Sequence, residues 1–495
     1  MTLCCLRVGC LRVGALRAVA LALLSTCGGL AHSQPAPAGW RMSLHLASPP
    51  QVSAALPAAT DWPTLLTAAR QAASNRREQA AVEAAQASHD QARISAWRPR
   101  VDATATNTQR WQRYNEQPIR SPNASAGLTL TQPLWRAAER TVADSLQSQA
   151  EQTAWQAREQ AQQVALEVSL AWLDAVEAAE TLKLNQARID ALRLQAQLNE
   201  RRVQAGVGTV VDQLETRGLL EQAQGERAVW QHRLNTARLQ VERLVGQAVP
   251  GPLQVPDGLH PMAAGDADPI VVPPLAEGLH LAPGANAAQQ ARERQLQGAR
   301  LQLSARQAER WQPTIDLVAE LSRTRQSQQF DGLSERQDIR NRAVGVQLNW
   351  PLFTSGYQQA RTREALALLQ QAEAARDEER AALDTRLREA YDTLQHSQRL
   401  LAVQHQLVRT AQTTHAAVHK AYLAGLRTHQ DLLTARQRID DSQQALVGTR
   451  IQSLKAQVRI LSLLEQLHAE RIAPLAQVFA REALAPTHPL PDDAP

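Results

Sequence analysis

Few residues of the chain have the types and spacing that chemistry at a site requires. His415 and His419 are four residues apart, so on a helix both imidazoles could touch one metal ion. The pair lacks the glutamate of an H-E-x-x-H metalloprotease site, and an exposed polar helix face explains it better. We therefore expect no metal site.

Signatures of nucleotide, hydrolase and redox sites are also missing from the sequence. Gly206-Val207-Gly208 lacks the rest of a nucleotide-binding loop and follows a helical pattern, not a strand. The patterns GxxxxGK[ST], GxSxG and CxxC do not occur. We expect that the protein is not an enzyme, has no cofactor and draws any energy for transport from partners.

Charge and composition favour long solvated helices. The 53 Lys and Arg residues against 48 Asp and Glu give a net charge of +5, but these charges are spread along helical patterns and do not cluster with aromatics. We therefore expect no nucleic acid partner. Aromatic residues make up only 3% of a chain that is 44% hydrophobic, which is typical of a long helical assembly and not of a large aromatic core.

The first residues have the pattern of a secretory signal. Arg7, Arg12 and Arg17 precede the apolar run at 18–24, and Ala31-His32-Ser33 offers small residues for cleavage. We interpret 1–33 as the signal peptide, which removes all four cysteines. A lipoprotein acylated at Cys27 is the alternative, although the β-branched Thr26 is a poor match before it. No apolar run near 20 residues follows, which excludes a helical membrane bundle.

An internal duplication organises the rest of the chain. Three features recur in the same order: a Trp-x-Pro triplet, a strand exit and a glycine junction followed by an aspartate. They are Trp97-Arg98-Pro99 and Trp311-Gln312-Pro313, Gln132-Pro133-Leu134-Trp135 and Trp350-Pro351-Leu352-Phe353, Gly206 with Asp212 and Gly425 with Asp431. The predicted divisions are a Pro/Ala-rich segment (34–59), a first repeat (60–245), a Pro/Gly-rich linker that cannot continue a helix (246–284), a second repeat (285–467) and a tail (468–495).

Each repeat changes from a period of two to a helical period. Apolar and polar residues alternate near 101–106, 126–131, 315–322 and 344–350, which predicts four strands, each about the 9–11 residues that cross a bilayer. Proline-free stretches at 136–205 and 357–424 carry apolar residues at heptad intervals, and second rods follow at 210–244 and 430–467. A rod of roughly 68 residues would be about 100 Å long. A coiled-coil filament or spacer is the alternative.

The aromatics separate these interpretations. Residues 97–135 and 311–357 hold more than half of the Trp, Tyr and Phe residues, as expected of the aromatic girdles of a transmembrane barrel. Packing under a soluble sheet is the alternative. Four strands cannot close a barrel, and an open edge in lipid leaves backbone groups unpaired. Two chains would give eight strands and a filled interior, whereas three would give twelve strands and a lumen. We favour three.

The order of these features resembles the TolC family of outer membrane factors. The resemblance covers about residues 60–467 and depends on the strand exits, the Gly206 and Gly425 junctions and the segment around Asp431. It implies a mainly α fold with a small β part: long antiparallel coiled-coil helices forming a periplasmic α-barrel, and four strands per chain in a trimeric 12-stranded outer-membrane β-barrel. It also implies a homotrimer in outer-membrane lipid, a periplasmic adaptor (membrane fusion) protein and an inner-membrane ABC or proton-driven transporter.

The same resemblance implies a gate just past each glycine junction. Tyr422 and Arg427 resemble the donors on the moving coil, and Asp212 resembles the acceptor on the neighbouring coil. An arginine fork and a phenol can share one carboxylate strongly enough to hold a closed state and weakly enough for a docking partner to overcome. Asp431 would stand at a pore constriction. The alternatives are an ordinary surface salt bridge, and an Asp431 that faces solvent outside the pore.

The expected function is an outer-membrane exit duct with a periplasmic extension. The poor lipoprotein signal favours type I secretion of a protein, in the manner of a cyclolysin-like toxin exporter. Small-molecule or multidrug efflux is the first alternative, and a non-conducting structural envelope trimer is the second.

Overall fold

The computed structural model describes residues 61–114, 117–249, 272–330 and 333–472. The predicted signal peptide (1–33) and the Pro/Ala-rich segment (34–59) lie outside the described residues. So do the middle of the predicted linker (250–271) and most of the predicted tail (473–495).

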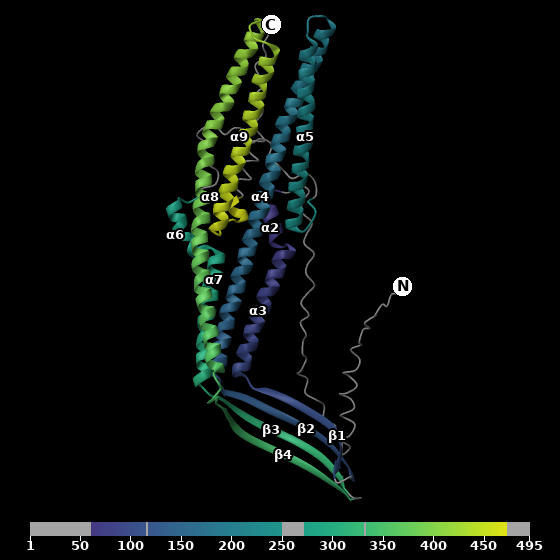
Figure 1. Ribbon diagram of the computed structural model, residues 1–495, viewed down its shortest axis with the longest axis vertical. Helices are drawn as coiled ribbons and strands as arrows, with labels where there is room; N and C mark the ends of the chain where they lie inside the picture. The colour runs from purple at the N-terminus through teal and green to yellow at the C-terminus, as the bar shows by residue number, and fades with distance from the viewer. Residues whose placement is uncertain (1–60, 115–116, 250–271, 331–332, 473–495) are drawn as a thin grey trace, which may run out of the picture. The chain divides into compact units, whose positions relative to one another are not determined.

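The elements occur twice in the order helix, two strands, two long helices (Figure 1). The first set is α3 (Ala73–Trp97), β1 (Arg100–Tyr114), β2 (Gln117–Trp135), α4 (Ala137–Gln204) and α5 (Val210–Val245). The second set is α7 (Ala287–Trp311), β3 (Thr314–Phe330), β4 (Leu333–Asn349), α8 (Tyr357–Leu423) and α9 (His429–Leu463). Short helices α2 (Trp62–Arg70) and α6 (Leu275–Ala285) precede the two sets. This repeated order matches the predicted duplication.

The helices α4 and α8 are the predicted rods. They have 68 and 67 residues, so each is about 100 Å long. Each begins a few residues after a strand and ends at the opposite end of the helical part, where it turns into α5 or α9 (Figure 1). Among the described helices, none is both long and apolar enough to span a membrane.

Each long helix packs antiparallel against its partner through small apolar clusters. Ile189 and Leu192 of α4 pack with Ala223 of α5. Leu387 of α8 packs with Ile460 of α9 in a second cluster. Exposed positions alternate with buried and half-buried ones along α5 and α8, as expected of a stripe repeated along a coiled coil, whereas most of α4 and α9 is at least half-buried.

The main core surrounds two stacked indoles. Trp62 of α2 and Trp172 of α4 lie with ring centroids 4.8 Å apart and an interplanar angle of 16°. Trp62 Nε1 donates a hydrogen bond to Ser169 Oγ at 3.1 Å, so the buried indole is not left unpaired. Val241 of α5 and Ile451 of α9 complete the cluster. The short helix α2 is thereby fixed against α4 and α5.

The predicted linker ends in a helix. Helix α6 begins after Pro274, which is its N-cap, and has Pro283 near its carboxyl end. Ala282 packs with Leu383 and Leu387 of α8, and Tyr391 donates a hydrogen bond to the Pro273 carbonyl at 2.5 Å. The start of a helix tolerates proline, and packing on α8 stabilises the remaining residues of α6.

The four strands form one antiparallel sheet in the order β1-β2-β3-β4. They have 15, 19, 17 and 17 residues, which is longer than the 9–11 predicted. The alternation that marks a strand in sequence weakens where both faces become polar, but backbone pairing continues there. Strand β4 ends one residue before Trp350. The β2–β3 register shifts between Pro133 and Trp135, because proline has no N–H for the ladder.

Candidate functional site

The two turns that join the long helices have the same backbone geometry. Gly206 has φ +72° and Gly425 has φ +76°, a left-handed conformation that costs glycine nothing in side-chain sterics. Thr209 and Thr428 then cap the next helix, because each side chain accepts a hydrogen bond from the backbone N–H three residues later. The end of the helical part that carries both turns is called the tip below (Figure 1).

Asp431 and Asp212 occupy equivalent positions three residues after these caps, but their carboxylates differ. The Asp431 carboxylate accepts hydrogen bonds from Thr428 N at 3.0 Å and Thr428 Oγ1 at 2.9 Å, which completes a capping box. The bond from the Thr428 backbone, the Thr428 hydroxyl and the nearby Arg427 lower the pKa of Asp431. The Asp212 backbone N–H reaches Thr209 Oγ1 at 3.1 Å, but no hydrogen bond or ion pair joins the Asp212 carboxylate to another described residue.

The predicted gate residues have partners other than each other within one chain. Arg202 Nη1 of α4 donates a hydrogen bond to the Tyr422 hydroxyl of α8 at 2.6 Å. Arg427 lies 3.8 Å from Asp431 in the following helix. Tyr422 therefore contacts the neighbouring coil through Arg202, which the sequence did not single out. Within one chain, Asp212 makes no direct contact with Tyr422 or Arg427.

A buried polar cluster that the sequence did not indicate lies beside these residues. Asn199 of α4 donates through Nδ2 to Thr216 Oγ1 of α5 at 2.9 Å and approaches His429 Nε2 of α9 at 3.2 Å. The three side chains are 4%, 0% and 7% exposed. Because the Asn199 amide is the donor, His429 Nε2 is the acceptor and its proton lies on Nδ1. The cluster ties three long helices together at the tip.

The environment of His429 favours the neutral form of its imidazole. Burial lowers the pKa of His429, and the positive charge of Arg202 acts in the same direction, while Asp212 and Glu215 oppose them. Nδ1 of the ring is buried without a hydrogen-bond partner. The residue could have been noticed from the repeat itself, since Thr428-His429 corresponds to Thr209-Val210 and places a titratable ring where the first repeat has valine.

Further polar contacts join α4 to α5 and α9 farther from the tip than this cluster. Arg188 Nη1 lies 2.9 Å from Glu226 of α5, and Arg188 Nε lies 3.7 Å from Asp440 of α9. The buried Lys455 of α9 lies 2.6 Å from Asp174 and 3.2 Å from Glu177 of α4. Positions 199, 188 and 177 of α4 are each eleven residues apart, a spacing that returns to one helix face after three turns. The polar contacts therefore recur along one antiparallel seam and specify its register.

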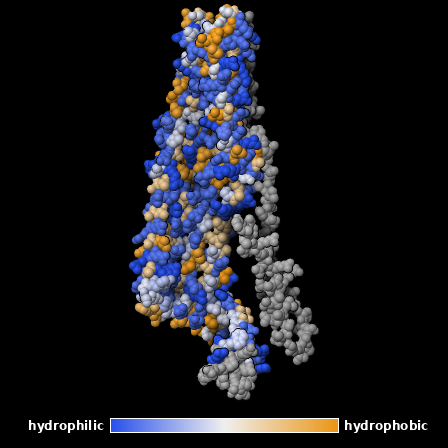
Figure 2. All heavy atoms as spheres, turned by 45° about the vertical axis from the view of Figure 1, so that its right-hand side comes forward, coloured by the Kyte–Doolittle hydropathy of each residue, from blue (hydrophilic) through white to orange (hydrophobic). Residues whose placement is uncertain are grey.

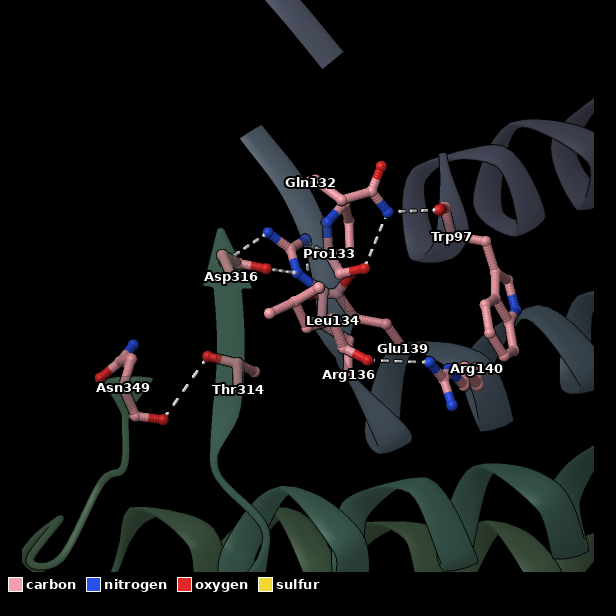
Figure 3. Close-up of polar contacts among 10 residues, drawn as sticks. All are labelled: Trp97, Gln132, Pro133, Leu134, Arg136, Glu139, Arg140, Thr314, Asp316 and Asn349. Carbon is pink, nitrogen blue, oxygen red and sulfur yellow. Dashed lines mark hydrogen bonds and ion pairs between the residues drawn. The ribbon is translucent and has the colours of Figure 1, made fainter. Parts of the chain in front are cut away.

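A second charged junction lies at the other end of α4, where the helix meets the sheet (Figure 3). Arg136 donates from Nε and Nη2 to the two carboxylate oxygens of Asp316 in β3, both at 2.8 Å, and from Nη1 to Glu139 at 2.9 Å. The hydrogen bond from Arg136 to Asp316 is the main reason that the pKa of Arg136 is raised. Beside it, the Arg140 guanidinium lies 3.5 Å from the centroid of the Trp97 ring. The fork from Arg136 to Asp316 connects the first repeat to the second.

The histidine pair singled out in the sequence lies on α8. His415 and His419 stack with ring centroids 6.3 Å apart, and they line a pocket of about 270 Å³ together with Arg188, Arg436 and Asp440. Burial lowers the pKa of His415, and Arg436 and His419 act in the same direction. Within the described residues, no group of three or more His, Cys, Asp or Glu side chains is arranged to hold a metal ion.

The chain resembles two curated secretion proteins. It is 26% identical over 308 residues to the alkaline protease secretion protein AprF of Pseudomonas aeruginosa, covering 61% of each chain. It is 26% identical over 324 residues to the proteases secretion protein PrtF of Dickeya chrysanthemi, covering 65% of this chain and 68% of that one. The match to AprF thus spans about three fifths of that relative's length.

Structural and family comparisons agree with this likeness. A crystal structure of a membrane protein from Pseudomonas aeruginosa superposes with a TM-score of 0.70 at 21% identity, covering 81% of this chain and 92% of that one. The profile of the outer membrane efflux protein family matches residues 67–247 and 286–465, one segment in each repeat. The resemblance predicted from the strand exits and glycine junctions is confirmed, as are the mainly α fold class and the outer-membrane location. The chain belongs to the outer membrane efflux protein family.

Proposed function

We propose that the protein is the outer-membrane exit duct of a tripartite export machine, most directly one for type I secretion of a protein. The observation that carries this proposal is the similarity to two proteins named for protease secretion, over 61% and 65% of the chain. Small-molecule efflux is the second candidate, because the matching family is named for efflux. Catalysis forms no part of the proposal.

The open sheet supports a trimer. Within the described sheet, β1 and β4 each pair on one side only, so each chain presents two edges of unpaired backbone groups. Lipid offers no partner for such groups, and a closed ring of strands removes the edges. Pairing β4 of one copy with β1 of the next would give a 12-stranded barrel with a lumen. The two repeats, 60–245 and 285–467, would contribute equally to it.

The tip offers a surface for the periplasmic adaptor. The surface of the helical part is largely hydrophilic, with apolar residues at its upper end in Figure 2. Exposed apolar side chains lie at both turns, with Val207 at 79%, Leu423 at 70% and Leu426 at 79%. Exposed apolar groups of this kind mark protein contacts. We assign the energy source to an inner-membrane transporter, ABC or proton-driven, which acts through that adaptor.

Contacts between neighbouring copies at the tip would form the gate. The Asp212 carboxylate has no bonded partner among the described residues of its own chain, whereas Arg427 is exposed and 3.8 Å from Asp431. A neighbouring Arg427 could therefore bond to Asp212 while Tyr422 stays on Arg202. The gate of three copies would open when a docking partner separates these side chains. Asp431 would contribute one carboxylate per copy to the constriction.

Planar-bilayer recording of the purified trimer tests the gate. Asp212→Ala and Arg427→Ser should each raise single-channel conductance without preventing assembly. The control pair is Asp190→Ala and Arg193→Ser, which removes an exposed bridge of 3.2 Å on α4. Conductance equal to the parent in both gate variants would reduce the pair to a surface bridge. Denaturant added to the chamber that faces the tip should loosen the gate. A parent trimer that does not conduct even then would favour the structural-trimer alternative.

The ring of Asp431 carboxylates is tested by trivalent block. Three close carboxylates should bind hexamminecobalt(III) far better than a monovalent cation. Asp431→Asn should abolish that block, and the exposed Asp441→Asn should leave it unchanged. Equal block in parent and Asp431→Asn would remove Asp431 from the pore.

Reconstitution in cells separates the two export functions. The chain is expressed in a strain that lacks its own outer-membrane duct, once with a protease exporter and its adaptor and once with a proton-driven drug pump and its adaptor. Appearance of the protease in the medium supports type I secretion. Drug resistance without protease export would support the efflux alternative.

A further inference from the structure

The two faces of the sheet differ in polarity, and this difference indicates which one meets lipid. Directly paired residues share a face, so the register places Val101, Leu130, Ala319 and Val344 in one row. On the opposite face, one row consists of Asp102, Thr129, Glu320 and Ala343, and the row after it consists of Thr104, Gly127, Ser322 and Asn341. The first face continues with exposed apolar side chains, including Leu128, Leu321, Val346 and Leu348. It is called the apolar face below.

The apolar face changes abruptly to arginine along β3 and β4. Beyond Leu321, the next two residues of β3 on this face are Arg323 and Arg325. Beyond Val344, the same alternation along β4 gives Arg342, Arg340, Asp338 and Arg336. The five arginines are called the arginine belt. On the described part of this face Asp338 is the only acidic residue, so the belt carries four net positive charges per chain.

Part of this charge has no compensating acidic group among the residues that the structure describes. Asp338 bonds to Arg323 at 2.9 and 2.5 Å and lies 3.7 Å from Arg325. Arg340 stands directly opposite Arg323, and like charges in directly opposite positions destabilise a sheet. Arg336, Arg340 and Arg342 are exposed on the same face. An anion that bridges these guanidinium groups would turn a repulsive array into an attractive one.

The position of the belt specifies where that anion would be. The apolar part of β3, from Ile315 to Leu321, is about 20 Å long along the strand, close to the height of the apolar band of a membrane barrel. Arginine on a lipid-facing surface is costly at mid-membrane and tolerated near the interface. The belt directly follows the apolar part, at the end of the strands farther from the long helices. It therefore marks the headgroup level of the distal leaflet.

We propose that Arg323, Arg325, Arg336, Arg340 and Arg342 form a binding surface for phosphate-bearing lipid headgroups in the outer leaflet of the membrane. The proposal rests on the proposed function, which puts the helices in the periplasm and the apolar face in lipid. Guanidinium forks match phosphate oxygens in pairs, and they are more weakly hydrated than ammonium groups. In a trimer the three belts would surround the barrel with bound lipid and steady its position in the membrane.

The test compares the parent trimer with a variant that carries Arg336→Gln, Arg340→Gln and Arg342→Gln. The probe is lipid A, a glycolipid with two phosphates, titrated into detergent-solubilised trimer and detected as bound lipid by native mass spectrometry. The variant should bind about a hundred-fold more weakly. The control variant carries Arg217→Gln, Arg300→Gln and Arg388→Gln, three arginines on helices that are 72%, 60% and 60% exposed. It should bind like the parent.

Two further arms identify the ligand. Lipid A stripped of its phosphates should bind the parent as weakly as the variant binds the intact lipid, and millimolar inorganic phosphate should not displace the intact lipid. Equal binding by parent and belt variant would overturn the proposal, as would equal binding of the two lipids. Displacement by inorganic phosphate would show a site for the free ion instead. Bilayer conductance of the parent and of the belt variant is recorded as well. If lipid binding does not differ but both trimers conduct, the lipid-binding proposal fails and the proposed exit duct stands.

Discussion

The two turns at the tip have the same local sequence pattern but different surroundings. Both have a glycine in the left-handed conformation and a threonine cap followed by an aspartate three residues later. After Thr209 the helix begins with Val210, which is 58% exposed, whereas after Thr428 it begins with His429, which is 7% exposed and bonded to α4. The first turn joins the same cluster only farther along α5, where Thr216 Oγ1 accepts from Asn199 and lies 3.4 Å from His429 Nε2. The second is fastened to the neighbouring coil.

The comparison separates what local sequence determines from what packing determines. Glycine and threonine produce the turn in both repeats because turn and cap chemistry involve only neighbouring residues. The role of the residue after the cap depends on which helix lies opposite, and that is decided by contacts more than 200 residues away. We infer that the residue after the second cap is held in place by α4, and that the Asp212 carboxylate at the α4–α5 turn is left available to a neighbouring copy.

Removing the anchor should have the largest effect. His429→Ala leaves the Asn199 amide without one partner and empties a buried space, and it should lower the free energy of unfolding of the tip by about 2 kcal/mol. Val210→Ala, at the equivalent exposed position, should change it by less than about 0.5 kcal/mol. Amide hydrogen exchange in the first turns of α9 and α5 measures both. Equal effects would mean that the two turns are anchored alike.

Most of the fold could be predicted from the sequence because its signals are local. The bounds of α4, α5 and α8 lie within about a residue of the predicted rods, since proline-free heptads and glycine turns mark them directly. The strands are longer than predicted because Asn107 to Arg110 are polar and show no alternation, although each pairs with β2. Pairing is a property of two segments, and a single segment does not reveal it.

The candidate site was predicted only in part, for the same reason. Asp431 could be identified by its distance from Gly425, and its cap follows from the sequence Thr428-x-x-Asp431. The bond from Arg202 to Tyr422 and the fork from Arg136 to Asp316 join residues 220 and 180 positions apart. No local spacing contains these pairs. Only the antiparallel register of the long helices and of the sheet brings them together.

Replacing the junction glycines tests whether the two turns are equivalent in their backbones. Gly206→Ala and Gly425→Ala should each cost about 1 kcal/mol, because an L-residue at positive φ is strained. A Cβ at either position meets no atom within 4 Å, so no clash adds to this cost. Gly→Asn at the same positions should cost less, since asparagine tolerates the left-handed region. Thermal unfolding followed by circular dichroism gives the comparison, and unequal losses would indicate hidden packing at one turn.

Acid should loosen the anchored turn and leave the other unaffected. The pKa of His429 is lowered in the folded state, so the unfolded state binds more protons once the pH falls below about 6.5. Stability of this turn should therefore decrease as the pH falls through 6.5, at most tenfold in the opening constant per pH unit, and level off below the folded pKa. His429→Asn removes the titrating group. Amide exchange of α9 measured between pH 7.5 and 5.0 should depend on pH in the parent more than in this variant.

Substitution of the two aspartates should have the smallest effects on stability. The variant with the larger effect on amide exchange should have the smaller effect on conductance. Asp431→Ala breaks a capping box, so exchange in the first turn of α9 should accelerate severalfold. Asp212→Ala leaves the Thr209 cap intact, because that cap uses only the backbone N–H of residue 212, and exchange at the start of α5 should change little. Conductance should respond in the reverse order, with Asp212→Ala opening the trimer more than Asp431→Ala does. If one variant has the larger effect on both exchange and conductance, a single carboxylate acts in both the cap and the gate, and the two turns do not have separate roles.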